Sequence, residues 1–237
     1  MFTLAAAAPT TYDQSLLCYL CTVFATVVGA VAGATAFSRQ RMDVVGILAC
    51  GTIASLGGGT VRDILLSGFV NAEGQPVTVY WMRGADTELL WEALGTSLVI
   101  FILARYTKAL PAGTIRVSDA FSMAFFSLLG TAKCYCLGCP PIVCVCMGVT
   151  TGVAGGVLRD VLTGNVPYVF RSKEIYALAS AAGCITFFIP LALGGSLELS
   201  FIIGTLVVFV TRMTAVWLNW RAPSYQPLFE KSHERQD

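Results

Sequence analysis

Charged residues are scarce in this chain of 237 residues. Asp, Glu, Lys and Arg make up 12% of it, whereas a soluble globular domain carries roughly 25%. Apolar residues make up 56%, and the mean hydropathy is +0.73. So few charges cannot cover a surface that faces water. The composition therefore excludes an ordinary soluble domain and predicts an integral membrane protein with several spans.

Other absences narrow the function. The sequence contains no phosphate-binding loop, no dinucleotide fingerprint and no pairing of a nucleophile with a base, so it supports neither an enzyme nor a bound cofactor. The net charge of +1 provides no basic surface for nucleic acid. Residues 1–14 contain no Lys or Arg and do not resemble a cleavable signal peptide. We expect them to form a short extracytoplasmic segment.

Apolar runs of about 20 residues predict helical spans, because the strands of a membrane barrel would be about 10 residues long and would alternate in polarity. The predicted fold is an all-α polytopic membrane protein with seven transmembrane helices. The predicted spans are Leu16–Phe37, Val44–Leu66, Thr87–Leu103, Val117–Leu137, Pro141–Leu162, Ile175–Leu193 and Leu197–Leu218.

The basic residues between these spans fall almost entirely on one side of the membrane. Only Arg83, in the polar insert Ser67–Asp86, lies on the other side. The protein is predicted to lie in the inner (plasma) membrane. Because basic loops stay in the cytoplasm, the N-terminus is predicted outside the cell membrane and the polar tail, residues 220–237, in the cytoplasm. The residues of the basic side are Arg39, Arg41, Arg105, Lys108, Arg116, Arg171, Lys173, Arg221, Lys231 and Arg235.

One motif occurs twice. GGGTVRDILL, residues 57–66, and GGVLRDVL, residues 155–162, superpose without a gap when the sequence is shifted by 97 positions. The shift also aligns Gly51 with Gly148 and Gly33 with Gly130, and both copies continue to a proline followed by aromatic residues. Each copy contains three spans. Because three is odd, the two copies are predicted to lie upside down relative to one another, an arrangement typical of transporters.

The repeated motif places charges inside predicted spans, where each costs about 2.5–3.5 kcal/mol unless it is paired or hydrated. Adjacent Arg and Asp point about 100° apart on a helix, so we expect cross-pairs instead, Arg62 with Asp160 and Arg159 with Asp63. The glycines allow the helices to kink or unwind, and Thr60 predicts a new half-helix just after the first break. At such a site, a carboxylate could bind the N-terminal end of the half-helix and the arginine, and an ammonium group could bind the aspartate. Alternatively, the glycines only pack helices.

Further ionisable residues lie near span ends. Lys133 is expected either to line the pathway or to extend to the interface, and Arg212 to extend toward the interface. The remaining three, Asp43, Asp119 and Glu198, flank spans and are expected at the interface.

Five of the nine cysteines crowd into CYCLGCPPIVCVC, residues 134–146. Their spacing invites a metal interpretation, but no histidine is near and helical geometry turns Cys144 and Cys146 to different faces. We expect no metal site. Two interpretations of these cysteines remain. They pack as small apolar residues, or they form a disulfide at the outward-facing turn.

The two motif copies resemble the paired motifs of the bacterial inner-membrane glycine transporter family, a former uncharacterised-protein family that is similar in fold to the trimeric intracellular cation channels. The resemblance implies two inverted three-helix repeats, residues 15–106 and 116–193, a last helix, 197–219, and a homotrimer. It also implies a pathway in each protomer beside the kinked second and fifth helices. The pathway residues it implies are Gly57, Gly58, Gly59, Arg62, Asp63, Gly155, Gly156, Arg159 and Asp160.

Three functions fit these observations. The first is transport of a small solute, glycine or a similar zwitterion, because the motif offers both charges beside glycines. The second is a potassium channel like the trimeric intracellular cation channels. The third is a membrane scaffold in which the glycines serve packing alone.

Overall fold

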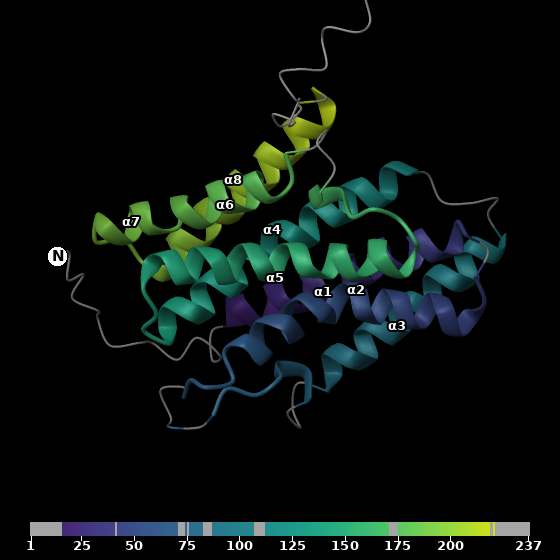
Figure 1. The fold of residues 1–237 in the computed structure, drawn as a ribbon, viewed down its shortest axis with the longest axis horizontal. Coiled ribbons are helices and arrows are strands. Elements are labelled where there is room, and N and C mark those ends of the chain that lie inside the picture. Colours follow the sequence, from purple (N-terminus) through teal and green to yellow (C-terminus); the bar gives the residue numbers. More distant parts are fainter. Residues whose placement is uncertain are drawn as a thin grey trace, which may run out of the picture.

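The computed structural model describes residues 16–40, 42–70, 74, 76–82, 87–106, 112–170, 175–218 and 220. These residues form an all-helical bundle (Figure 1). The helices are α1 (Leu16–Ser38), α2 (Val44–Leu65), α3 (Glu88–Tyr106), α4 (Ala112–Cys136), α5 (Pro141–Leu162), α6 (Ala177–Thr186), α7 (Phe188–Ala192) and α8 (Leu197–Trp217), with two 3-10 helices, η2 (Tyr80–Met82) and η3 (Tyr168–Phe170).

The predicted spans agree closely with these helices, with one exception. The sixth span is divided into α6 and α7, because the backbone of Phe187 interrupts the helix. Pro190 explains the division, since proline has no N–H to donate to the carbonyl four residues earlier. Asp43, expected at the interface, caps α2 by accepting a hydrogen bond from the backbone N–H of Gly46 at 2.8 Å.

Five of the described helices, α1, α2, α3, α5 and α8, are long and apolar enough to cross a membrane. The predicted fourth and sixth spans are not among them. The α6–α7 segment is apolar but short. In contrast, α4 is long enough but contains Arg116, Asp119 and Lys133. It lies against α1, α5, α6 and α8. Asp119 and Lys133 form ion pairs inside the bundle, whereas Arg116, near the start of α4, is exposed.

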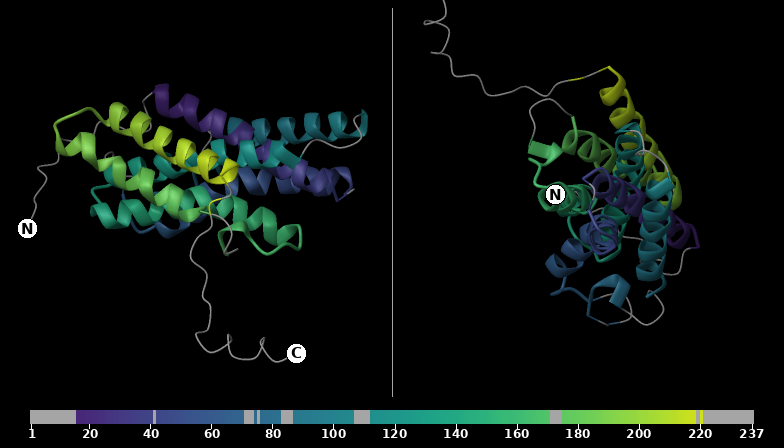
Figure 2. Two further views of the ribbon diagram at one scale, coloured as in Figure 1. Left: turned by 90° about the horizontal axis from the view of Figure 1, so that it is seen from above. Right: turned by 90° about the vertical axis from the view of Figure 1, so that its right-hand side faces the viewer.

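Four helices form the centre of the bundle. The contacting pairs are α1 with α2, α4 with α5, α1 with α4, and α2 with α5. On one side α3 packs against α1 and α2, and on the other α6 and α8 pack together against α5 and α4 (Figure 1). Figure 2 shows the same bundle from above and from one end. The first three helices and the next three therefore occupy equivalent places around the α2–α5 contact.

The two halves run in opposite directions. Lys133, near the end of α4, forms an ion pair with Asp63, near the end of α2. Asp119, in the first half of α4, forms an ion pair with Arg159, near the end of α5. The C-terminal ends of α2 and α5 therefore lie at opposite ends of α4, as an inverted repeat requires.

Glycines permit the close contact between α2 and α5. A Cβ placed on Gly58 would collide with the carbonyl oxygen of Thr151, and one placed on Gly155 would collide with the carbonyl oxygen of Ala54. The 97-residue shift aligns Thr151 with Ala54, so the two contacts are related by the internal symmetry. Small residues at this crossing let the two backbones approach each other directly.

The expectation that the helices unwind at the glycines and restart as half-helices is wrong. Both α2 and α5 remain α-helical through their glycines. Thr60 starts no new half-helix, because its hydroxyl donates a hydrogen bond to the carbonyl of Leu56 at 2.8 Å, one turn earlier. Gly57 faces the side chain of Leu158, which would lie 2.6 Å from an added Cβ. The missing side chains thus make room for helix contacts without unwinding the backbone.

The glycine contacts predict a selective sensitivity to alanine. Gly58→Ala should lower stability by about 1–3 kcal/mol, because the new methyl group must push α5 away. Gly95→Ala on α3 is the matched control, since no other atom lies within 4 Å of its added Cβ. Thermal unfolding in detergent measures both variants. Equal melting temperatures for the two would show that the crossing tolerates the added atom.

Candidate functional site

The first charged cluster lies at the C-terminal ends of α2 and α4. It consists of Arg62, Asp63 and Lys133. Asp63 Oδ1 accepts hydrogen bonds from Arg62 Nε at 2.8 Å and from Lys133 Nζ at 3.0 Å. The Asp63 side chain is fully buried, and the Lys133 side chain is 15% exposed. Lys133 therefore binds inside the protein and does not extend to the interface.

Asp63 also holds the segment that follows α2. Its second oxygen accepts a hydrogen bond from the backbone N–H of Tyr80, the first residue of η2, at 2.9 Å. The guanidinium carbon of Arg62 lies 5.4 Å from the centre of the Tyr80 ring. Gly59 lies under the same ring, since an added Cβ would collide with it. The Asp63 carboxylate thus holds the Tyr80 ring next to the Arg62–Asp63 pair.

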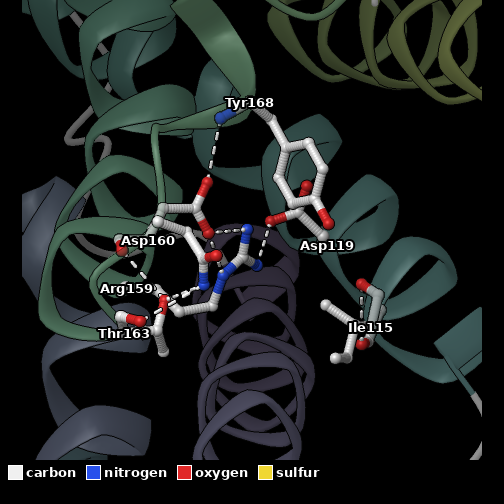
Figure 3. A network of polar contacts seen from close by, with 8 residues as sticks. Ile115, Asp119, Arg159, Asp160, Thr163 and Tyr168 are labelled. Carbon is white, nitrogen blue, oxygen red and sulfur yellow. Dashed lines mark hydrogen bonds and ion pairs between the residues drawn. The ribbon is translucent and has the colours of Figure 1, made fainter. Parts of the chain in front are cut away.

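The second charged cluster lies near the C-terminal end of α5 and consists of Arg159, Asp160 and Asp119. Arg159 Nη1 donates to Asp119 Oδ1 at 2.6 Å, and Arg159 Nε donates to Asp160 Oδ1 at 2.9 Å (Figure 3). The Arg159 side chain is only 2% exposed, so both carboxylates counter its charge away from water. Asp119 comes from α4, as Lys133 does in the first cluster.

The second cluster repeats the backbone contact of the first. Asp160 Oδ2 accepts a hydrogen bond from the backbone N–H of Tyr168, the first residue of η3, at 2.9 Å (Figure 3). The guanidinium carbon of Arg159 lies 5.8 Å from the centre of the Tyr168 ring. One feature is not repeated. The indole N–H of Trp81 donates to the hydroxyl of Thr60 at 2.9 Å, and the residue aligned with Thr60 is Val157.

A buried tyrosine and a further arginine adjoin the second cluster. The Tyr176 hydroxyl and Asp119 Oδ1 lie 2.6 Å and 3.3 Å from the place that a Cβ on Gly156 would occupy. The guanidinium carbon of Arg212, on α8, lies 4.7 Å from the centre of the Tyr176 ring. Arg212 is 2% exposed, so the expectation that it extends to the interface is wrong.

The predicted cross-pairs are also wrong. Arg62 binds Asp63 and Arg159 binds Asp160, their neighbours in sequence. The long arginine side chain closes the angle of about 100° that separates adjacent positions on a helix. The clusters cannot exchange partners, because the C-terminal ends of α2 and α5 lie at opposite ends of α4.

The two clusters differ in the sign of the charge that is in excess among their ion-paired groups. In the first cluster one carboxylate lies between two cations, and in the second one cation lies between two carboxylates. The difference comes from α4, which supplies Lys133 to one end and Asp119 to the other. Each pair of the repeated motif is therefore completed by a third charge that the repeat does not contain.

A cavity of about 250 Å³ opens beside the second cluster. This is far more than the roughly 10–15 Å³ that one water molecule needs, so the cavity has room for several waters. It lies between the end of α1 and the segment that follows α5. Its polar lining comes from Arg39, Gln40, Arg159, Asp160, Thr163, Asn165 and Tyr168.

A much smaller void, about 10 Å³, lies at the glycine crossing and is lined by Gly58, Gly155, Gly156, Asp119 and Arg159 among others. This volume is at the lower limit for one water molecule. Arg159 lines both the cavity and the void. The cavity therefore ends at a buried guanidinium, and the space beyond it is closed in this structure.

The nine predicted pathway residues and Lys133 thus divide among the two charged clusters and the helix contacts around them. Sequence reasoning missed Asp119, which was expected at the interface but is 7% exposed. An acidic residue within a predicted span is a functional candidate by default, and that rule would have found it. It also missed the roles of Tyr80 and Tyr168, although both follow the repeated proline. In the described part of the chain no group of three His, Cys, Asp or Glu residues could hold a metal ion.

Comparisons with known proteins agree on one family. The sequence model of the family described as glycine transporter matches residues 19–105 and 116–191. The inner membrane protein YadS of Escherichia coli K12, of the family UPF0126, is 33% identical over 217 residues, covering 89% of this chain and 97% of that protein. A UPF0126 membrane protein of Vibrio cholerae is also 33% identical, over 216 residues, covering 91% and 85%.

The fold is similar to that of solved cation channels. The trimeric intracellular cation (TRIC) channel orthologue of Rhodobacter sphaeroides superposes with a TM-score of 0.75 at 28% identity, covering 86% of this chain and 99% of that one. A second TRIC channel structure superposes with a TM-score of 0.73 at 25% identity, covering 88% and 97%.

The ion pairs predict which side chains are energetically coupled. A double-mutant cycle on Arg159→Ala and Asp119→Ala should give a coupling of about 1–3 kcal/mol, because the two groups share a buried contact. The same cycle on Arg62 and Asp160, which belong to different clusters, should give less than about 0.5 kcal/mol. Unfolding in detergent measures both. Coupling in the second cycle and none in the first would contradict the pairing described here.

Proposed function

The chain belongs to the glycine transporter family, and from that premise we propose that it transports a small zwitterion, glycine first among the candidates, along a pathway beside α2 and α5. It is a multi-pass membrane protein of a transporter or channel family. The chemistry of the second cluster and its cavity supports this choice of substrate.

The observation that carries the proposal is the mixed lining of the cavity. Two guanidinium groups, Arg39 and Arg159, and one carboxylate, Asp160, line a space of about 250 Å³, with the amide groups of Gln40 and Asn165 beside them. The volume is below the range of roughly 300–1,000 Å³ typical of sites for drug-sized ligands. A molecule that is small and carries both charges is complementary to such a lining.

The existing ion pairs favour a zwitterion over a simple ion. Asp160 and Asp119 already accept hydrogen bonds from Arg159, so a lone cation would have to compete with that guanidinium for them. A zwitterion can enter the pair by offering a carboxylate to the guanidinium and an ammonium group to the carboxylate. Each protein charge then exchanges one partner for another of the same sign, so no charge is left unpaired in the membrane.

Passage beyond Arg159 requires movement of the helices. The void at the Gly58–Gly155 contact is too small for any amino acid, and both helices are continuous. We therefore infer that α2 and α5 shift relative to one another as rigid bodies, as the halves of inverted-repeat transporters do. The hydrogen bond between Trp81 and Thr60 holds η2 in place at the first cluster. Its absence from the repeat at Val157 favours opening at the second cluster.

A cation channel is the second candidate, because the chain shares the fold of the TRIC channels. The assignment of potassium as cargo faces one physical objection. A cation would pass the first cluster, in which Arg62 and Lys133 outnumber Asp63.

Two further features belong to the same proposal. We infer that the second cluster and its cavity face the cytoplasm, because the loops predicted to be basic lie at that end of the bundle. We also infer a homotrimer, since the Rhodobacter sphaeroides channel is described as trimeric. The pathway proposed here lies within one chain, so it needs no contribution from a neighbouring copy.

The proposal is tested in liposomes that contain the purified full-length chain. Uptake of labelled glycine should saturate with concentration. Arg159→Ala and Arg62→Ala should each lower the initial rate at least about tenfold, equivalent to ~1.4 kcal/mol, because each removes a cationic partner from a buried carboxylate. Arg159→Lys should retain more uptake than Arg159→Ala.

Arg105→Ala is the control for the loss of a positive charge, because Arg105 is exposed at the end of α3 and belongs to neither cluster. It should leave uptake unchanged. Potassium flux is measured in the same liposomes. A potassium current with no saturable glycine uptake would contradict the transporter proposal and support the channel. Full activity of both arginine variants would contradict the assignment of the site.

A further inference from the structure

Three buried thiols meet at the turn between α4 and α5. Cys134 and Cys144 are completely buried, and Cys139 is 7% exposed. They belong to one apolar cluster that also contains Leu66 and Val77, from the segment after α2. The thiol of Cys144 donates a hydrogen bond to the carbonyl of Cys139 at 3.3 Å. The proposed transport function uses none of these groups.

The end of α4 brings two of the thiols together. The backbone N–H of Cys139 donates to the carbonyl of Cys134 at 3.2 Å, and that of Gly138 donates to Tyr135 at 2.9 Å. Gly138 has a φ of +74°, in the left-handed region that favours glycine. This pair of bonds defines a Schellman motif, in which the side chains at the positions of Cys134 and Cys139 commonly touch. The sequence spacing alone did not reveal this contact.

The first repeat shows what packing requires at these positions. The 97-residue shift aligns Cys134 with Phe37, Cys139 with Met42 and Cys144 with Ile47. Phe37 and Ile47 are buried in an apolar cluster of their own. A Cβ on Gly46 would lie 3.3 Å from the side chain of Met42 and 3.6 Å from that of Phe37.

In the other half, Phe37 and Ile47 therefore fill the same corner of the fold with larger apolar side chains, whereas Met42 is 43% exposed. Packing does not explain why the second half has three cysteines there, since no sulfur is needed to build this turn. The chemistry that distinguishes a cysteine from the residues of the first repeat is oxidation of its thiol.

We propose that Cys134 and Cys139 are a modification site at which the two thiols are oxidised to a disulfide. The oxidant is a disulfide, either glutathione disulfide or the active-site disulfide of a thiol–disulfide oxidoreductase. The thiolate of one cysteine attacks a sulfur of the oxidant and displaces one thiol. The second cysteine loses its proton, attacks the mixed disulfide and releases the other thiol. Two electrons and two protons pass from the pair to the oxidant, which leaves as two thiols.

Cys139 meets the oxidant first, because it is the most exposed of the three and lies in the turn outside both helices. Burial raises the pKa of the Cys139 thiol to about 12. The thiolate is therefore rare in the packed turn, and exchange takes place when the turn opens or before it packs.

The disulfide would act on the first charged cluster. Cys134 directly follows Lys133, whose ammonium group binds Asp63. A bridge from Cys134 to Cys139 fixes the last turn of α4 and with it the backbone that carries Lys133. Reduction would loosen this end of α4 while leaving the helices and their glycine contacts intact.

The test counts thiols in the full-length chain, purified without reductant and incubated with glutathione disulfide. After denaturation, seven of the nine cysteines should react with a maleimide, and all nine after reduction. Reduction should also lower the melting temperature in detergent by about 5 °C, as expected for a short disulfide loop in a chain of this size. Nine reactive thiols before reduction would overturn the proposal.

Variants assign the bridge. Cys139→Met, which introduces the residue of the first repeat, should leave all eight remaining thiols reactive. Cys139→Ser should give the same count if methionine disturbs folding. Cys136→Ser with Cys146→Ser is the control, because these cysteines of the same segment lie outside the buried cluster; two thiols should remain protected there. Protection that persists without Cys139 would overturn the Cys134–Cys139 pairing.

Discussion

The constraint on which the structure depends is that every charge inside the bundle must be countered there. Each Arg-Asp pair meets it in the same way, at the last turns of α2 and of α5. One oxygen of the aspartate binds the neighbouring arginine, and the other binds the backbone N–H of a tyrosine that begins a 3-10 helix. The pair therefore also fixes the chain that leaves the helix. A third charge from α4 completes each cluster, which explains why α4 is central and the least apolar of the long helices.

Glycine and charge have separate roles in the repeated motif. Gly58 and Gly155 let α2 and α5 touch along unbroken backbones, whereas the arginines and aspartates lie at the two ends of the contact. The proposed pathway is therefore closed by packed helices at its middle and by ion pairs at its ends. In the proposed mechanism, rigid movement of one half against the other would open it without exposing backbone polar groups to lipid, an exposure that costs several kcal/mol for each group.

The helices and the inverted repeat could be predicted because they depend on local features, long apolar runs and the doubled GGxxRD. The partners of the charges could not. Asp119 and Lys133 are not in the repeat, and only the packing of α4 brings them to Arg159 and Asp63. Intrinsic flexibility suggested broken helices at the glycines, but tertiary contact decided their role, since the missing side chains are replaced by a neighbouring helix. The division of α6 from α7 at Pro190 was within reach of sequence rules.

The most direct test of the central claim, that a mixed-charge site recognises a zwitterion, is equilibrium binding of three small molecules to the purified chain. Glycine carries both charges, acetate only the negative one and methylammonium only the positive one. The account predicts that glycine binds at least about tenfold more tightly than either analogue, a difference of ~1.4 kcal/mol, because each analogue leaves one protein charge without its new partner. Binding of methylammonium or potassium as tight as that of glycine would contradict it.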